Sequence, residues 1–154
     1  MRLCWFLTLL LSVALGATLY LFVVRGSVAP ASDGRVAILL EPGERDLVLS
    51  EMRAFLQSVQ RILASASAGD LERVATAARQ VGAEAQVGVP ASLMSKLPLD
   101  FKALGLDTHR QFDQLALNAE DLGDPAQAIR ELSELLAGCV GCHAAYRIDT
   151  LGGP

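Results

Sequence analysis

Hydrophobic and polar residues divide the chain into one long apolar run and a series of amphipathic patterns. The apolar run covers residues 3–24 and contains no charged side chain. At about 1.5 Å of rise per residue, a helix of this length spans roughly 33 Å, enough to cross the hydrocarbon core of a bilayer. A signal peptide usually has a shorter apolar region, of about 7–15 residues. The pattern therefore favours an uncleaved transmembrane anchor over residues 1–25, with a cleaved signal segment as the alternative, and in both cases the rest of the chain is exported.

A tether and four amphipathic helices are predicted after the apolar run. Residues 26–43 mix Gly, Pro and Ser with a short apolar patch and predict the tether. Beyond them, apolar residues recur at steps of three and four, the period of a helix that buries one face. Clear breakers delimit predicted helices at residues 44–67, 71–85, 108–122 and 125–147, with a short helical turn at residues 99–104. No strand-like alternation of useful length appears. The sequence therefore predicts an all-α chain, in which residues 44–148 form an antiparallel four-helix bundle and residues 149–154 form a tail.

The predicted inner faces of these helices are poor in large side chains. The second helix is rich in alanine, and the aromatic residues expected to face inward are Phe55, Phe101, Phe112 and Tyr146. A lining of this kind either packs thinly or encloses something large.

The charge of the exported part is acidic. Residues 32–154 keep all 17 acidic residues but lose Arg2 and Arg25 from the 13 basic ones, which leaves a formal charge of −6. An acidic surface argues against binding to nucleic acid and to anionic lipid head groups. It suits a basic redox partner, although acidic surfaces also serve solubility alone.

The most specific motif is "GCVGCHAAYR", near the end of the chain. It holds two of the three cysteines, Cys139 and Cys142, and one of the two histidines, His143. Residues at i, i+3 and i+4 share one helix face, and the spacing C-x-x-C-H is the attachment signature of c-type haem. Both thiols can bond the vinyl groups of one porphyrin, while the imidazole turns toward the iron. Attachment outside the cytoplasm agrees with the export segment, so we expect one covalent haem c.

Three other interpretations of this motif explain it less well. A redox Cys-x-x-Cys of the thioredoxin type lies at a helix N-terminus, whereas this motif lies about four turns into a helix. A zinc site needs four ligands, and His109 is the one histidine left to supply the fourth. A structural disulfide between the two motif cysteines leaves His143 unexplained. The remaining cysteine, Cys4, reads as a small apolar residue of the anchor.

A haem motif at the C-terminal end of a four-helix pattern resembles cytochrome c-prime and its low-spin relatives. The resemblance covers roughly residues 44–148 and rests on "CVGCHAAYR" and, in the first helix, on "EMRAFLQSVQ". It implies that Met52 faces the iron on the side opposite His143, and that Arg147 lies against the proximal face. A compact connection between the second and third helices and the N-terminal anchor depart from the family pattern. Independently of the resemblance, we expect Tyr146 to pack beside the porphyrin edge, with its hydroxyl near solvent.

Met52 and His109 each leave alternatives open. If the Met52 thioether binds iron, the haem is six-coordinate and low-spin and the protein carries electrons. If Met52 only packs over the haem, as a methionine on an apolar stripe usually does, the iron is five-coordinate and open to diatomic gases. His109 reads as a solvated or capping residue, with a hydrogen bond to a haem propionate or a bis-histidine haem as lesser alternatives. Arg147 also suits the C-terminal end of a helix without any haem.

The sequence as a whole predicts a periplasm-facing c-type cytochrome, anchored in a bacterial inner membrane, that carries single electrons between redox partner proteins. No catalytic dyad or activated nucleophile appears, so we expect no enzyme activity. A five-coordinate protein that binds NO or CO is the alternative, followed by a small zinc-binding membrane protein. The family resemblance also leaves a homodimer open.

Overall fold

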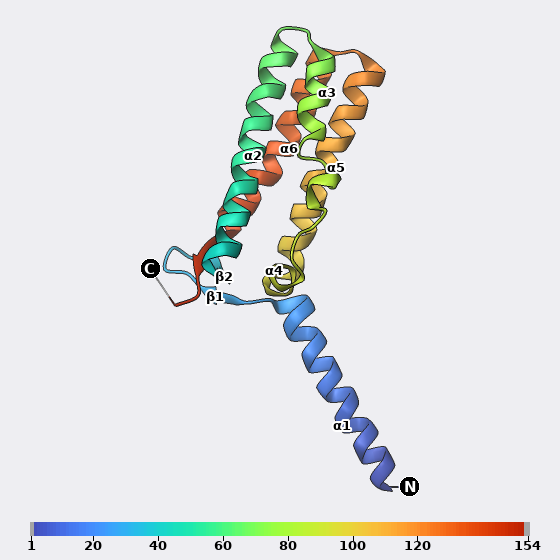
Figure 1. Ribbon diagram of the computed structural model, residues 1–154, viewed down its shortest axis with the longest axis vertical. Helices are drawn as coiled ribbons and strands as arrows, with labels where there is room; N and C mark the ends of the chain where they lie inside the picture. The colour runs from blue at the N-terminus through green and yellow to red at the C-terminus, as the bar shows by residue number, and fades with distance from the viewer. Residues whose placement is uncertain (1, 153–154) are drawn as a thin grey trace.

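The computed structural model describes residues 2–152 and is mostly helical (Figure 1). Its helices are α1 (Arg2–Leu19), α2 (Pro42–Ser67), α3 (Leu71–Arg79), α4 (Ala91–Lys96), α5 (Leu99–Leu122) and α6 (Pro125–Ala145). A π-helical segment, Tyr20–Arg25, continues α1, and a 3₁₀ turn, Ala83–Gln86, follows α3. Three short strands complete this part of the chain: β1 (Val28–Pro30), β2 (Val36–Leu40) and β3 (Tyr146–Thr150).

Helices α2, α3, α5 and α6 lie side by side and share one hydrophobic core (Figure 1). Helix α3 packs against α2 and α5, and α6 packs against α5 and α2. Ile62 of α2 and Phe112 of α5 are fully buried in this core. On α3, the buried side chains include Ala75, Ala77 and Ala78, whose small size lets the neighbouring helices approach closely. The alanine-rich inner face predicted for this segment is therefore confirmed.

Capping residues explain where α2 and α6 begin. Helix α2 starts at Pro42, two residues before the predicted start, because Glu41 and Glu44 form a reciprocal capping box in front of it. The Glu44 carboxylate accepts a hydrogen bond from the Glu41 amide at 3.0 Å. Helix α6 starts as predicted, since the Asp124 side chain accepts a hydrogen bond from the Ala126 amide at 2.9 Å.

Three other helix boundaries differ from the prediction. Helix α3 ends at Arg79, earlier than the predicted residue 85, because the Asp113 carboxylate of α5 accepts a hydrogen bond from the Ala83 amide at 2.8 Å and supports the 3₁₀ turn. Helix α5 runs without a break through Gly105, where the sequence predicted a stop. A glycine inside a helix costs only about 1 kcal/mol relative to alanine, so packing along the inner face of α5 outweighs it. Helix α6 ends at Ala145, two residues before the predicted end.

A three-stranded sheet occupies segments that the sequence assigned to the tether and to the chain end. Strand β1 pairs antiparallel with β2, and β2 pairs parallel with β3, in register from Val36↔Tyr146 to Leu40↔Thr150. The all-α prediction is wrong in this respect. The first two residues of the predicted tail, Asp149 and Thr150, belong to β3. Ile38 and Leu40 are completely buried, and they form a second apolar cluster with Val48 of α2 and with residues of α4 and α5. Burial of this short apolar patch is the physical reason that the supposed tether folds.

The connection between α1 and the rest of the chain is tightly packed. The Ser27 amide donates to the Lys96 carbonyl at 2.7 Å, and Lys102 Nζ donates to the Val23 carbonyl at 3.0 Å. Gly26 has φ 65°, and a Cβ atom there would lie 2.4 Å from the Lys96 carbonyl oxygen. Only glycine fits this left-handed, crowded position without strain.

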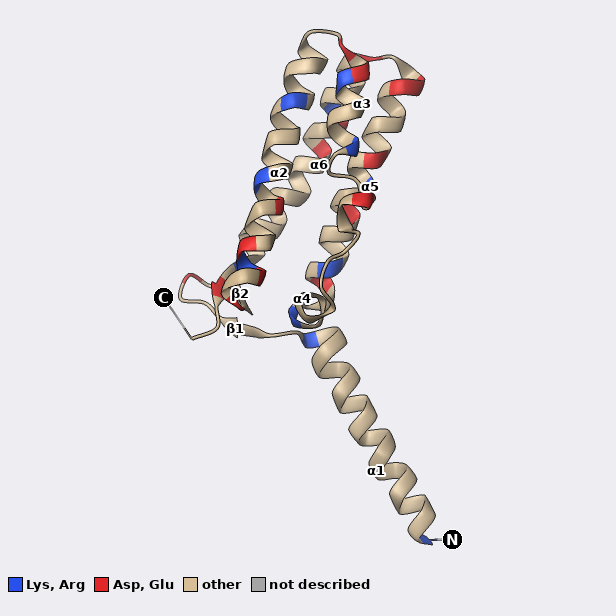
Figure 2. Cartoon of the chain, in the orientation of Figure 1, with Lys and Arg blue, Asp and Glu red and all other residues tan. Residues whose placement is uncertain are grey.

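Helix α1 extends away from the other helices, and all of its described side chains are exposed (Figure 1). The continuous helical segment Arg2–Arg25 is long and apolar enough to cross a membrane, with a mean hydropathy of 2.3 in its most apolar window. Figure 2 shows that charged residues are confined to the ends of this segment, while acidic and basic residues are spread over the other helices. The length and composition of this segment fit a signal sequence as well as a membrane-spanning helix.

Candidate functional site

Cys139, Cys142 and His143 lie in the last turns of α6, as the sequence predicted. Both cysteines are free thiols and are half-buried, whereas His143 is exposed. Burial raises the pKa of both thiols, and for Cys142 the neighbouring Cys139 raises it further. A redox-active Cys-x-x-Cys nucleophile requires the opposite, a lowered thiol pKa. The local environment therefore argues against chemistry of the thioredoxin type.

Two cavities meet around these residues, between α2 and α6. The larger one, of about 440 Å³, has a mostly apolar wall that includes Met52, Phe55, Cys139 and His143. The smaller one, of about 190 Å³, also contains Met52 and His143 in its wall, together with Cys142. The two cavities thus share the methionine and the histidine. The structure therefore places the four residues predicted to bond or ligate a haem around two adjoining cavities, with Cys139 in the wall of the larger and Cys142 in the wall of the smaller.

Tyr146 and Arg147 line the smaller cavity as well, although they lie on β3 and not on the helix predicted to extend that far. The Tyr146 ring packs edge-on against Phe101 of α5, with ring centroids 5.4 Å apart. The Arg147 guanidinium is paired with Asp149 at 2.9 Å and with Asp33 at 3.4 Å. Both side chains therefore lie beside the motif, held by partners outside α6.

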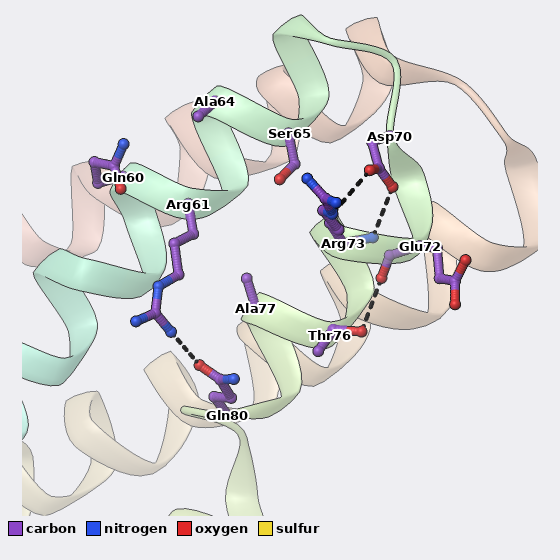
Figure 3. A pocket seen from close by; sticks show the side chains of 10 residues that line it. All are labelled: Gln60, Arg61, Ala64, Ser65, Asp70, Glu72, Arg73, Thr76, Ala77 and Gln80. Carbon is purple, nitrogen blue, oxygen red and sulfur yellow. Dashed lines mark hydrogen bonds and ion pairs between the residues drawn. The ribbon is translucent and has the colours of Figure 1, made fainter.

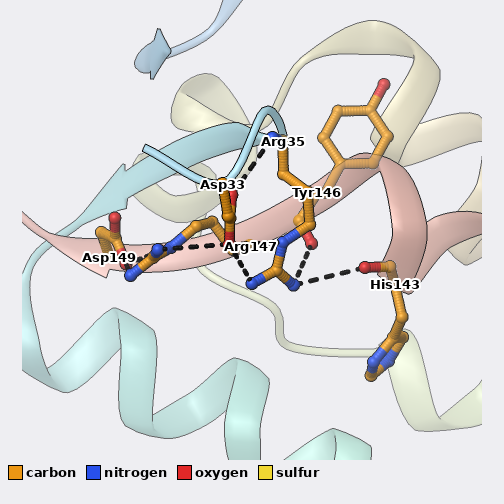
Figure 4. A network of polar contacts seen from close by, with 6 residues as sticks. All are labelled: Asp33, Arg35, His143, Tyr146, Arg147 and Asp149. Atoms are coloured by element: carbon orange, nitrogen blue, oxygen red, sulfur yellow. Dashed lines mark hydrogen bonds and ion pairs between the residues drawn. The ribbon is translucent and has the colours of Figure 1, made fainter. Parts of the chain in front are cut away.

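Arg35 is a residue of this site that the sequence did not reveal. It comes directly before β2, in the segment predicted to be a tether, and it lines the smaller cavity. Its guanidinium donates to the carbonyl oxygens of His143 and Tyr146, each at 3.3 Å (Figure 4). Hydrogen bonds from Arg35 also lower the pKa of Asp33 to about 2. No local motif marks Arg35, because the two carbonyl groups that place it at this site belong to residues more than 100 positions away in the chain.

His109 is buried, which corrects the expectation of a solvated or capping residue. Because α5 begins at residue 99 and not at residue 108, His109 lies inside the helix on its inner face, with 2% of its surface exposed. Its Nδ1 lies 2.7 Å from the Val81 carbonyl, and its ring is 4.9 Å from that of Phe55. Its Nε2 lies 3.3 Å from Glu51 Oε1 and 2.6 Å from the Gln86 side-chain amide. His109 is not part of the wall of either cavity, so its geometry does not support a propionate contact or a second axial histidine.

His109 gives the fold a pH-dependent stability. Burial alone opposes protonation, but Glu51 and the Val81 carbonyl outweigh it and raise the pKa of His109 above its usual value. A histidine whose pKa is higher in the folded state than in the unfolded chain stabilises the fold when it is protonated. This contribution is complete below the pKa of the unfolded chain, about 6.5, and it is lost as the pH rises through the pKa of the folded state.

We therefore expect the free energy of unfolding of the full chain in detergent to fall as pH rises from about 5.5 to about 7.5, a range that spans the unfolded pKa of histidine and lies below the pH at which the cysteine thiols titrate. His109→Gln should remove most of this fall, because glutamine carries no titrating group. Urea unfolding followed by circular dichroism measures both chains at both pH values. An equal fall in the variant and the native chain would show that another group is responsible.

A larger hollow, of about 620 Å³, lies between α2 and α3, away from the cysteine motif (Figure 3). Four of its polar side chains bond to each other in pairs. Arg61 donates to Gln80 at 2.7 Å, and Arg73 pairs with Asp70 at 3.1 Å. The size of a cavity therefore does not identify the candidate site. The thiol, thioether and imidazole groups of the predicted site line the two smaller cavities beside His143.

Within residues 2–152, no three His, Cys, Asp or Glu side chains converge on a point where they could hold one metal ion. Comparisons with protein-family models, with curated proteins and with solved structures give no match for this chain. The resemblance to cytochrome c-prime therefore rests on the sequence motifs alone.

Proposed function

We propose that this chain is a c-type cytochrome that binds one covalent haem and carries single electrons. The observation that carries the proposal is the shared cavity wall of Met52 and His143, next to the free thiols of Cys139 and Cys142. Covalent attachment of a c-type haem uses two thiols on one helix face, an imidazole beside them and apolar surface around them. The thiols and the imidazole on α6 and the apolar walls of the two cavities support this proposal.

Each of the four residues has a distinct role in this proposal. Cys139 and Cys142 would each form a thioether between Sγ and a vinyl carbon, with the thiol hydrogen passing to the other carbon of the same vinyl group. His143 would bind the iron through its imidazole, and Met52 through its sulfur from the opposite helix. When bound, the haem supplies a one-electron cycle between ferrous and ferric iron. Phe55 and the other apolar residues of the larger cavity would exclude water from this space.

The architecture proposed for the haem domain is an antiparallel four-helix bundle over residues 44–148. The shared core of α2, α3, α5 and α6 supports it. So do the tight turns at Gly69 and Gly123, each of which joins two consecutive helices through a glycine with positive φ. The small sheet would then close one end of the bundle, beside the haem site.

We further place the domain on the periplasmic side of a bacterial inner membrane, anchored by α1 or released if α1 is cleaved. The length and apolar character of Arg2–Arg25 support an export segment of either kind. The acidic surface suits basic redox partner proteins, and nucleic acid is not an expected partner. A homodimer is compatible with this proposal.

The second candidate function is a five-coordinate haem protein that binds NO or CO. It is favoured by one observation: Met52 is only half-buried and borders free space in both cavities, so its sulfur has room to stand away from the iron. A zinc-binding membrane protein has less support, because the motif residues do not converge on one point among the described residues. Thioether bonding at the porphyrin edge requires no such convergence.

The visible spectrum of the reduced full chain, recorded before and after addition of CO, distinguishes these functions. We expect a sharp low-spin α band that CO does not change, because Met52 closes the sixth position. A broad high-spin spectrum that shifts with CO would replace electron transfer by gas binding. A chain without any Soret band would exclude both haem functions.

A further inference from the structure

Arg35 lies in the hairpin formed by the antiparallel strands β1 and β2, and it connects this hairpin to the end of α6 that carries the candidate haem ligand. Its Nη1 donates to the carbonyl oxygens of His143 and Tyr146, each at 3.3 Å. On its other side, Nε and Nη2 donate to Asp33 Oδ2 at 3.0 and 2.6 Å. Figure 4 shows the guanidinium lying between the aspartate and the end of the helix. The guanidinium of this half-buried side chain is thus held on one edge by Asp33 and on the other by the His143 and Tyr146 carbonyls.

Of the two carbonyl groups that Arg35 reaches, that of His143 belongs to the last turn of α6, and that of Tyr146 belongs to the first residue of β3. The final four carbonyls of a helix have no partner within the helix and need one from elsewhere. The Cys142 carbonyl accepts a hydrogen bond from the Tyr146 amide, and the His143 carbonyl accepts one from the Arg35 guanidinium. A guanidinium can donate to two oxygens in a fixed geometry, whereas a lysine ammonium is a single point charge on a flexible stem.

The sheet holds Arg35 at this position. Val36 is aligned with Tyr146 in the parallel pairing of β2 with β3, so the residue before Val36 comes next to the end of α6. Arg35 also lines the smaller cavity, whose wall contains Met52 and His143. The hairpin therefore supplies one side chain, Arg35, that lines the cavity and also donates a hydrogen bond to the backbone of the proposed iron ligand.

We propose that Arg35 is a positioning residue for His143: it fixes the backbone at the end of α6 and thereby the direction in which the imidazole faces the haem. This inference rests on the proposed function, in which His143 binds iron. It also assigns the small sheet a role, because the sheet sets the position of Arg35.

Two readouts on the full chain in detergent test the inference, with Arg35→Gln, Arg35→Lys and, as a charge-matched control at the start of α2, Arg45→Gln. The first is hydrogen exchange of the amides of residues 143–147, measured with and without haem. We expect exchange to be about tenfold faster in Arg35→Gln, because the bonds from a charged donor to the last turn are lost. Arg35→Lys should lie between Arg35→Gln and the native chain, and Arg45→Gln should match the native chain.

The second readout reports on the ligand itself. In a Met52→Ala background the reduced iron keeps His143 as its single protein ligand, and the iron–histidine stretching band becomes observable by resonance Raman spectroscopy. Arg35→Gln should broaden and shift this band, because the imidazole samples more orientations, whereas Arg45→Gln should leave it unchanged.

Unchanged exchange and an unchanged band in Arg35→Gln would overturn the inference. Equal changes in Arg35→Gln and Arg45→Gln would also overturn it, because the effect would then follow charge and not the bonds to α6. Circular dichroism of each variant is the control for retention of the helices. If the proposed function itself fails, no variant shows an iron–histidine band, while the exchange measurement still reports on the contact between Arg35 and α6.

Discussion

His143→Ala should leave the haem attached but remove its proximal ligand. The two thioethers at Cys139 and Cys142 do not depend on the imidazole, so the denatured variant should retain its colour. The reduced spectrum should lose the native low-spin form entirely, because no other histidine borders the cavities. Visible spectroscopy of the native chain and the variant, before and after denaturation, measures both properties.

The other histidine provides a matched control for this prediction. His109 is buried on α5 and lies outside both cavity walls, so His109→Gln should preserve the reduced spectrum of the folded protein. A native spectrum in His143→Ala would show that a different residue is the proximal ligand. Loss of the native spectrum in both variants would assign the effect to the fold and not to ligation.

Met52→Ala should convert the iron from six-coordinate and low-spin to five-coordinate and high-spin. A thioether ligand raises the reduction potential, and axial ligands as a group span about 0.8 V. We therefore expect the potential to fall by on the order of 0.1 V and the reduced protein to gain the ability to bind CO. Redox titration followed by the visible spectrum, with and without CO, measures these changes.

Met94→Ala is the control for the Met52 substitution. Both methionines are half-buried against the second apolar cluster, but Met94 belongs to α4 and lines neither cavity. Removing either side chain should destabilise the fold to a similar extent, by roughly 2 kcal/mol, so stability alone cannot separate the two variants. If Met52→Ala retained a low-spin spectrum insensitive to CO, Met52 would not be the sixth ligand.

Local patterns were sufficient to predict the parts of the site that lie on helices. The spacing of Cys139, Cys142 and His143 fits one face of a helix, and Met52 belongs to an apolar stripe with helical period. The described structure forms α2 and α6 at these positions and places the four side chains around two adjoining cavities. Helix patterns depend on neighbours three and four residues apart, so they can be read from a single sequence.

Features that depend on distant partners could not be predicted in this way. The "VAILL" patch of β2 is too short to show a period, and it is a strand because it pairs with residues 146–150 at the other end of the chain. Arg35 was missed for the same reason. His109 was misplaced because Gly105 reads as a helix stop, while the packing of α5 continues the helix through it.

The intact mass of the denatured and reduced chain tests the central claim most directly. The chain should be expressed in cells that attach haem to exported cytochromes, and measured beside a Cys139→Ser, Cys142→Ser double variant. We predict that the native chain carries the added mass of one haem after denaturation and that the double variant carries none. A native chain of unmodified mass, with both thiols of α6 free to react with an alkylating reagent, would contradict the assignment of this protein as a c-type cytochrome.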